Sequence, residues 1–197
     1  MPKNTDVRVG APDQKVTGAI KHAPVGTILP DLTNITKAAV TLNQAFTGDE
    51  YVSEDGLTLS PSRSTTEIKD WSGSTVRKVL ESFDGTLSWT MISTNEGALS
   101  IAFGADHVTT AAATTAHGAQ VKAALGAYLP EAQAWVFLMK DGDARIVIAV
   151  PDGQITEVGE VTFASNAAVG WNVTLSCYPD ANGNSIYIMT DDGVVTA

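Results

Sequence analysis

The sequence predicts a mostly antiparallel β protein, built as a sandwich or barrel, with one short helix. Apolar and polar residues alternate in several short runs, most clearly in Thr86–Ile92, where Leu87, Trp89 and Met91 share one face. Turn-forming residues separate these runs about every 8 to 15 positions. The 17 glycines and 8 prolines lie mostly between apolar runs, which is typical of all-β domains.

The first thirty residues are expected to form an N-terminal arm or a peripheral strand, and residues 31–197 a single β domain. Proline and glycine interrupt residues 1–30, which contain one short apolar piece at Val16–Ile20. A chain of 197 residues is long enough for one domain with a sizeable core. Ile35–Ala45 is compatible with either a strand or a helix, and a turn is expected at Gly48-Asp49-Glu50.

Residues 56–92 predict consecutive strands joined by tight turns. Extended segments are expected at Gly56–Ser62, Thr65–Trp71 and Thr75–Phe83. Ser72-Gly73-Ser74 predicts a turn, and Asp84-Gly85 is a pair typical of two-residue hairpin loops.

One helix is expected near residues 94–103. Ser93 followed by Glu96 fits a capping box, in which each side chain accepts a hydrogen bond from the other residue's amide. The apolar residues that follow allow about two helical turns, and Gly104 is a good helix terminator.

The C-terminal half predicts further hairpins. In Ala105–Leu129, alanine favours helix, but the threonines and the His117-Gly118 turn favour two strands. Asp141-Gly142-Asp143 predicts a hairpin turn between two apolar strands. The remaining expected strands are Gln154–Phe163, Gly170–Tyr178 and Ser185–Thr190.

The charge distribution argues against tight nucleic-acid binding. The net charge is −10, and residues 131–197 carry only Lys140 and Arg145 against nine carboxylates. Tight binding to phosphates needs clustered lysine and arginine. Solubility alone is the alternative explanation for the acidity.

No residue pattern indicates catalysis, a cofactor or a metal, so we expect a protein that is not an enzyme. Phosphate-binding glycine motifs and nucleophile motifs are absent, and the three histidines lack the spacing of a metal pair. Cys177 alternates with apolar residues and is expected to be a buried strand thiol. The run that begins at Asp180 partly matches a calcium loop, but Ser185 stands where that loop needs glycine, so we expect a tight turn. No apolar segment is long enough for a membrane span, so no membrane insertion is expected.

Five segments carry a resemblance to a known family. They are GLTLSPSRSTTEIKDWSG, VRKVLESFDGTLSWTMI, TNEGALSIAFG, WVFLMKDGDARIVIAVPDGQITEVGEVTF and LSCYPDANGNSIYIMTDDG. These segments, within Ile28 to Gly193, resemble the major tail tube protein of long-tailed, non-contractile bacteriophages. The resemblance implies two packed antiparallel sheets with one flanking helix, and six-fold rings stacked into a tube that conducts the viral genome.

The resemblance also implies a location and partners. The protein would be part of the virion tail and would assemble in the host bacterial cytoplasm. Its partners would be other copies of itself, the tape measure, the tail terminator and the baseplate or distal tail proteins, with DNA passing without tight binding. Because the sequence ends at Ala197, the extra C-terminal immunoglobulin-like domain of some relatives is not expected.

Pro61–Gly73 is the candidate contact between rings, because it is a polar, strand-forming segment. Its candidate residues are Arg63, Glu67, Lys69, Asp70 and Trp71. The alternative is an ordinary solvated loop with Trp71 folded onto the core.

Four carboxylates that border strands in the acidic third are candidates for facing the lumen: Asp141, Asp143, Glu157 and Glu160. An acidic wall would repel DNA over about 8 Å at physiological salt. The alternative is that these groups lie outside the tube and keep it soluble.

Two other functions stay open. One is another tail subunit, such as a tail terminator. The other is a β-sandwich ligand-binding module, which would expose aromatic residues on one sheet face. The alternating patterns around Trp71, Trp89, Trp135 and Trp171 indicate mostly core positions instead.

Overall fold

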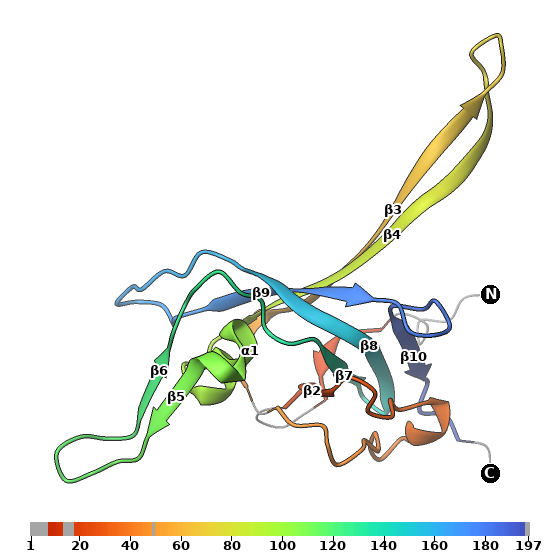
Figure 1. Ribbon diagram of the computed structural model, residues 1–197. Coiled ribbons are helices and arrows are strands. Elements are labelled where there is room, and N and C mark those ends of the chain that lie inside the picture. Colours follow the sequence, from red (N-terminus) through yellow and green to blue (C-terminus); the bar gives the residue numbers. More distant parts are fainter. Residues whose placement is uncertain (1–7, 14–17, 49, 196–197) are drawn as a thin grey trace.

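The computed structural model describes residues 8–13, 18–48 and 50–195. Most of the described strands form one large, curled antiparallel sheet with the order β1-β7-β8-β9-β4-β3, in which β10 pairs with β8 and β2 with β7 (Figure 1). Strands β5 and β6 form a second, two-stranded sheet. The predicted class, mostly β with one helix, is confirmed.

The elements have the following bounds. The strands of the large sheet are β1 (Ala11–Pro12), β2 (Ile20–Pro24), β3 (Val52–Lys69), β4 (Thr75–Met91), β7 (Gln133–Asp141), β8 (Ala144–Val158), β9 (Trp171–Tyr178) and β10 (Tyr187–Asp191). The small sheet consists of β5 (Val108–Ala111) and β6 (Gln120–Ala123). The helix is α1 (Glu96–Phe103), and two short 3-10 turns are η2 (Leu32–Asn34) and η3 (Ala105–His107).

Strands β7 and β8 lie at the centre of the molecule, where side chains from other elements cover both of their faces. On one face Trp135 packs against Trp89, with ring centroids 5.5 Å apart, in a cluster that includes buried residues of α1. On the other face Val136 and Val147 belong to a second cluster together with Phe46. Burial on both faces explains why these strands are almost continuously apolar.

The segment between β2 and β3 covers this second face. Ile35, which is buried, forms an isolated bridge with Val40, and η2 comes just before it. Ile35–Ala45 therefore forms neither a strand nor a helix, although its sequence was compatible with both. The predicted division at residue 30 stays a prediction, and residues 16 and 17 of the expected apolar piece lie outside the described residues.

The predicted helix is present, but its predicted N-cap was wrong. Asn95 caps α1, because its side chain accepts a hydrogen bond of 2.9 Å from the amide of Ala98. The hydroxyl of Ser93 instead accepts from the amide of Tyr51, just before β3. The helix ends at Gly104 as expected, with φ at +84°.

The Asp84-Gly85 pair does not form a hairpin turn, and that prediction was wrong. Strand β4 continues through both residues, and Gly85 pairs with Pro61 of β3 on one side and with Cys177 of β9 on the other. A Cβ at Gly85 would lie 2.6 Å from Ile186 Cδ1. The glycine therefore serves close packing, because pairing on both edges overrides the local turn preference.

Two other hairpins are where the sequence placed them. Asp141 pairs with Ala144 around Gly142, whose φ is +60°. The Ala-rich region contains the two expected strands, paired from Val108 with Ala123 to Ala111 with Gln120. Among the described residues, no helix is long and apolar enough to cross a membrane.

Candidate functional site

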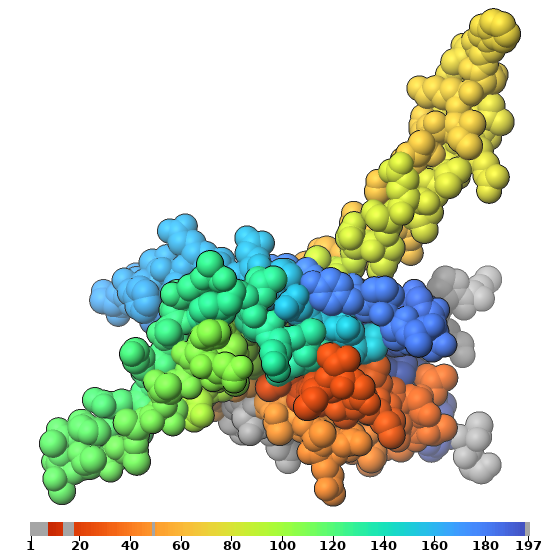
Figure 2. Space-filling model, viewed as in Figure 1, coloured from red at the N-terminus to blue at the C-terminus, as the bar shows by residue number. Residues whose placement is uncertain are grey.

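The most prominent surface feature is a two-stranded ribbon that projects far from the body (Figures 1 and 2). We call residues 61–84 the arm. The outer halves of β3 and β4 form it, pairing from Ser62 with Asp84 to Lys69 with Thr75. Every residue of the arm is exposed.

The tip of the arm is an ordered turn, as the sequence predicted. The carboxylate of Asp70 accepts hydrogen bonds from the amides of Ser72 and Ser74, at 2.9 and 2.8 Å, and from the hydroxyl of Ser72 at 2.6 Å. Gly73 has φ at +86°, which favours glycine. The hydrogen bond from the Ser72 side chain, followed by those from backbone amides, lowers the pKa of Asp70.

All five candidate contact residues lie on the arm. Arg63 lies over the ring of Phe83, with its guanidinium carbon 5.4 Å from the centroid. Glu67 forms an ion pair of 3.1 Å with Lys78, and Lys69 and Asp70 lead into the tip.

Trp71 is fully exposed at the tip of the arm. The alternative in which it folds onto the core is therefore wrong. The other tryptophans follow the core pattern to different degrees, because Trp89 and Trp135 are buried and Trp171 is half-buried.

The structure separates the four lumen candidates into two pairs. Asp141 and Asp143 flank the β7–β8 turn, whereas Glu157 lies near the far end of β8 and Glu160 just beyond it. Asp141 accepts a hydrogen bond of 3.0 Å from the amide of Val9. Asp143 forms an ion pair of 2.7 Å with Lys37. Glu157 and Glu160 are exposed and have no hydrogen bond or ion pair among the described residues.

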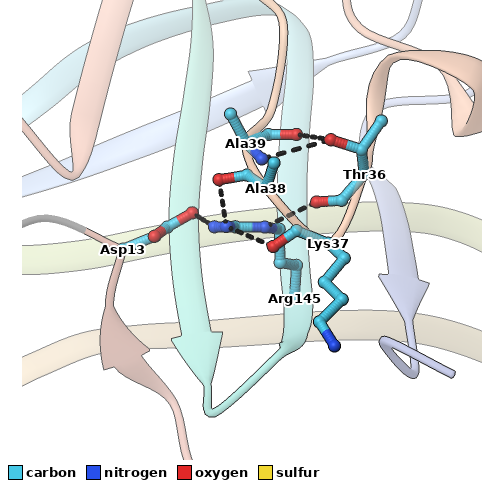
Figure 3. A network of polar contacts seen from close by, with 6 residues as sticks. All are labelled: Asp13, Thr36, Lys37, Ala38, Ala39 and Arg145. Atoms are coloured by element: carbon cyan, nitrogen blue, oxygen red, sulfur yellow. Dashed lines mark hydrogen bonds and ion pairs between the residues drawn. The ribbon is translucent and has the colours of Figure 1, made fainter.

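Sequence reasoning missed a buried polar centre around Arg145 (Figure 3). Its guanidinium donates to the carbonyls of Thr36, Lys37 and Ala38 at 2.8, 3.0 and 2.8 Å. It also forms an ion pair with Asp13. Arg145 points to the same side of β8 as the buried Val147, and this arginine in an apolar alternating run was the available signal.

Cys177 and Asp180, which the sequence analysis considered, have structural roles. Burial raises the pKa of the Cys177 thiol to about 12, which agrees with the predicted buried strand position. Asp180 accepts from the amides of Asn182 and Asn184, at 2.8 and 3.0 Å, as a tight turn requires. Within the described part of the chain, no group of three His, Cys, Asp or Glu residues could hold a metal ion.

A comparison with protein-family models identifies one family. The family model described as "Phage tail tube protein" matches residues 3–197. The cap of the anti-feeding prophage, a tube-terminating cap, is a similar solved structure with 15% identity and a TM-score of 0.43, covering 77% of this chain and 86% of that one.

A second similar structure belongs to the virion of a native gene transfer agent particle, with 11% identity, a TM-score of 0.39, and coverage of 75% of this chain and 92% of that one. No protein with a curated description matches the sequence. Because the family model covers almost the whole sequence, the chain belongs to the phage tail tube protein family.

Proposed function

We propose that copies of this chain close into six-membered rings and that the rings stack into the tube through which the viral genome passes. Membership in the family makes the chain a structural, non-enzymatic component of the virion tail. It also implies assembly with other virion proteins. The finer proposal depends on one observation, the projecting arm.

The arm is poorly suited to a solitary protein. An isolated two-stranded ribbon is marginally stable in water, because nothing covers its faces. Apolar side chains on this ribbon are nevertheless exposed: Ile68, Trp71, Val76, Val79, Leu80 and Phe83. Exposed apolar surface of this kind is typical of interaction sites.

We assign to the arm the contact between successive rings. A projection that fits a different surface of an identical subunit makes a head-to-tail contact, and such contacts propagate into open assemblies. Arg63, Glu67, Lys69, Asp70 and Trp71 are the proposed contact residues, with Trp71 as the apolar residue at the tip.

Ring closure would use the edge of the large sheet. Strand β3 is the last strand of the described path, so its outer edge has no strand partner among the described residues. A neighbouring subunit that pairs with this edge would satisfy its backbone groups and hide a surface prone to aggregation.

The passing DNA would meet a wall without strong phosphate sites. Glu157 and Glu160 are the better lumen candidates, because hydrogen bonding or ion pairing already engages Asp141 and Asp143. The remaining proposed partners are the tape measure, the tail terminator and the baseplate or distal tail proteins, and assembly would take place in the host cytoplasm.

Negative-stain electron microscopy of purified protein tests the proposal. The wild-type chain should form tubes with six-fold end views. A variant in which a short turn joins Pro61 directly to Gly85 should stay folded and form no tubes. This deletion removes paired segments of both strands, whereas removal of 61–73 alone would leave the outer half of β4 without a partner.

A matched control shortens the loop at residues 112–119, which is also exposed but lies between β5 and β6. It should leave tube formation unchanged. A wild-type chain that stays monomeric under all assembly conditions would contradict the proposal, and normal tubes from the arm deletion would contradict the role of the arm.

A further inference from the structure

The two faces of the arm differ chemically, and the strand register defines them. Residues paired across two strands point to the same side of the ribbon. One face, which we call the core-side face, continues the pairs Leu57 with Trp89 and Leu59 with Leu87, whose β4 members are buried in the core. On the arm this face consists of Arg63, Thr65, Glu67, Lys69, Thr75, Lys78, Leu80 and Phe83.

The second face, which we call the outer face, is rich in hydroxyl groups. It consists of Ser62, Ser64, Thr66, Ile68, Arg77, Val79, Glu81, Ser82 and Asp84. Glu81 is the additional residue at a register shift, and it belongs here because its carboxylate accepts hydrogen bonds from Ser64 and Thr66.

Side-chain contacts on the core-side face agree with this assignment. Glu67 accepts a hydrogen bond of 3.0 Å from Thr75 and pairs with Lys78 at 3.1 Å. Arg63 lies over Phe83. None of these contacts crosses from one face to the other.

The charges differ between the faces. The core-side face carries three cations, Arg63, Lys69 and Lys78, against the single carboxylate of Glu67. It also exposes the two apolar side chains Leu80 and Phe83. The outer face has the opposite balance, with Arg77 against two carboxylates. The outer face likewise exposes two apolar side chains, Ile68 and Val79, so the difference between the faces is one of charge, and the core-side face is the cationic one.

We propose that the core-side face of the arm docks onto the acidic surface of a second copy of this chain. The arm carries four cations and four carboxylates, so the rest of the chain carries the whole net charge of −10. A second copy therefore offers the complementary charge. This inference rests on the proposed function, because it names the face by which the arm joins one ring to the next.

The docked second copy would also extend the hydrophobic core along the arm. Leu87 is buried in the body, and Phe83 and Leu80 continue its side of β4 into solvent. A surface that covers Phe83 and Leu80 makes that apolar stripe continuous. On the outer face, Ile68 and Val79 do not continue a buried stripe, because the pairs of that face nearer the body are Thr58 with Ser88 and Ser60 with Thr86.

Two neighbouring residues on opposite faces provide a matched test. Leu80 and Val79 are both exposed and both lie on β4. Leu80→Ser should raise the critical concentration for tube assembly by about tenfold or more, whereas Val79→Ser should change it by less than about twofold. The measurement is sedimentation of tubes over a protein dilution series. Equal effects of the two variants would overturn the proposal.

Charge reversal tests the electrostatic part. Arg63→Glu should weaken assembly more at about 0.05 M than at about 0.5 M salt, because salt screens the new repulsion. Arg77→Glu, on the outer face, is the control and should have little effect at either concentration. A stronger effect of Arg77→Glu than of Arg63→Glu would overturn the assignment of the docking face.

Photo-crosslinking identifies the occupant. A photoreactive amino acid replaces Thr65 on the core-side face or, as the control, Thr66 on the outer face. Tubes are assembled from a mixture of isotopically labelled and unlabelled chains in the presence of duplex DNA. Crosslinks from position 65 should join chains of different label at acidic segments outside the arm, and those from position 66 should be at least several times fewer. Crosslinks from position 65 mainly to DNA would overturn the proposal.

The outcomes separate this inference from the proposed function. A wild-type chain that forms no tubes would refute both. Normal wild-type tubes with equal sensitivity of the two faces would refute the docking face alone.

Discussion

Arg145 and Asp13 form an ion pair that links the N-terminal segment to the central strand β8. The same guanidinium binds three carbonyls of residues 36–38. One buried side chain therefore holds three parts of the chain together (Figure 3), and it lies at the opposite end of β8 from Glu157. A buried charge is stable only when it is paired and hydrogen-bonded, and Arg145 meets both conditions.

Arg145→Ala should lower the free energy of unfolding by about 3 kcal/mol, because it leaves Asp13 and three carbonyls without their partner. Urea unfolding followed by tryptophan fluorescence measures the change. Lys37→Ala is the control, because it breaks the exposed ion pair with Asp143 near the same turn. That change should cost less than about 1 kcal/mol. Similar losses in both variants would contradict the role of burial.

Trp89→Ala should lower the free energy of unfolding by about 3 to 5 kcal/mol, since Trp89 is buried against Trp135 and Phe137. Leu87→Ala should lower the free energy of unfolding by about 2 to 5 kcal/mol, because Leu87 is buried as well. Trp71→Ala is the control. It should leave the stability of the monomer within about 0.5 kcal/mol of wild type, because Trp71 is fully exposed. Denaturant unfolding under conditions that prevent assembly compares the three variants.

Asn95→Ala should lower the free energy of unfolding by about 1 kcal/mol, because it removes the side chain that caps α1. Asn95→Asp keeps a capping oxygen and should recover most of the loss. Thermal unfolding followed by circular dichroism ranks the wild type and the two variants by stability. If Asn95→Asp were as unstable as Asn95→Ala, the cap would not be the cause.

The Cys177 thiol should resist alkylation in the folded protein at pH 8 and react quickly in urea, because burial raises its pKa from 9.0 to about 12. Folding favours the neutral thiol, so this contribution to stability is complete below pH 9 and is lost as the pH rises toward 12. Cys177→Ala should remove this part of the alkaline pH dependence. An unchanged pH profile in the variant would assign the dependence to other groups.

Unmodified tubes should bind no appreciable duplex DNA even at low salt, because phosphate binding needs clustered cations. A double variant, Glu157→Lys with Glu160→Lys, should retain DNA with a steep salt dependence and slow genome delivery. This double variant is compared with a second one, Asp141→Lys with Asp143→Lys, which places the same two cations at the other end of β8. Filter binding and single-virion ejection measure the two effects. Tight binding of DNA by unmodified tubes would refute the repulsive wall.

Local chemistry made parts of the fold predictable. Asp141-Gly142-Asp143 and Ser72-Gly73-Ser74 form turns because each has a glycine with positive φ, and at the second turn the nearby Asp70 accepts from the amides of Ser72 and Ser74. The alternation of Leu87, Trp89 and Met91 placed all three in the core, since a half-buried strand requires this pattern.

Competition between local and long-range pairing explains the errors. Asp84-Gly85 has the composition of a turn, but strands β3 and β9 pair with β4 on both sides and hold it extended. Ser93 fits a cap, but Asn95 is also a good cap and Ser93 binds Tyr51 from another part of the chain. In each case a partner far away in the sequence decided between two locally allowed structures.

The sequence by itself determined the β-rich class, the position of the helix, most of the turns and the resemblance to a tail tube protein, because these depend on neighbouring residues and on patterns along the chain. Only the tertiary structure decided that Arg145 is buried, since its carbonyl partners lie more than a hundred positions away. It likewise decided that Trp71 is exposed and that the arm has two unlike faces. Both features depend on the register in which β3 and β4 pair as they leave the body, and no local pattern specifies that register.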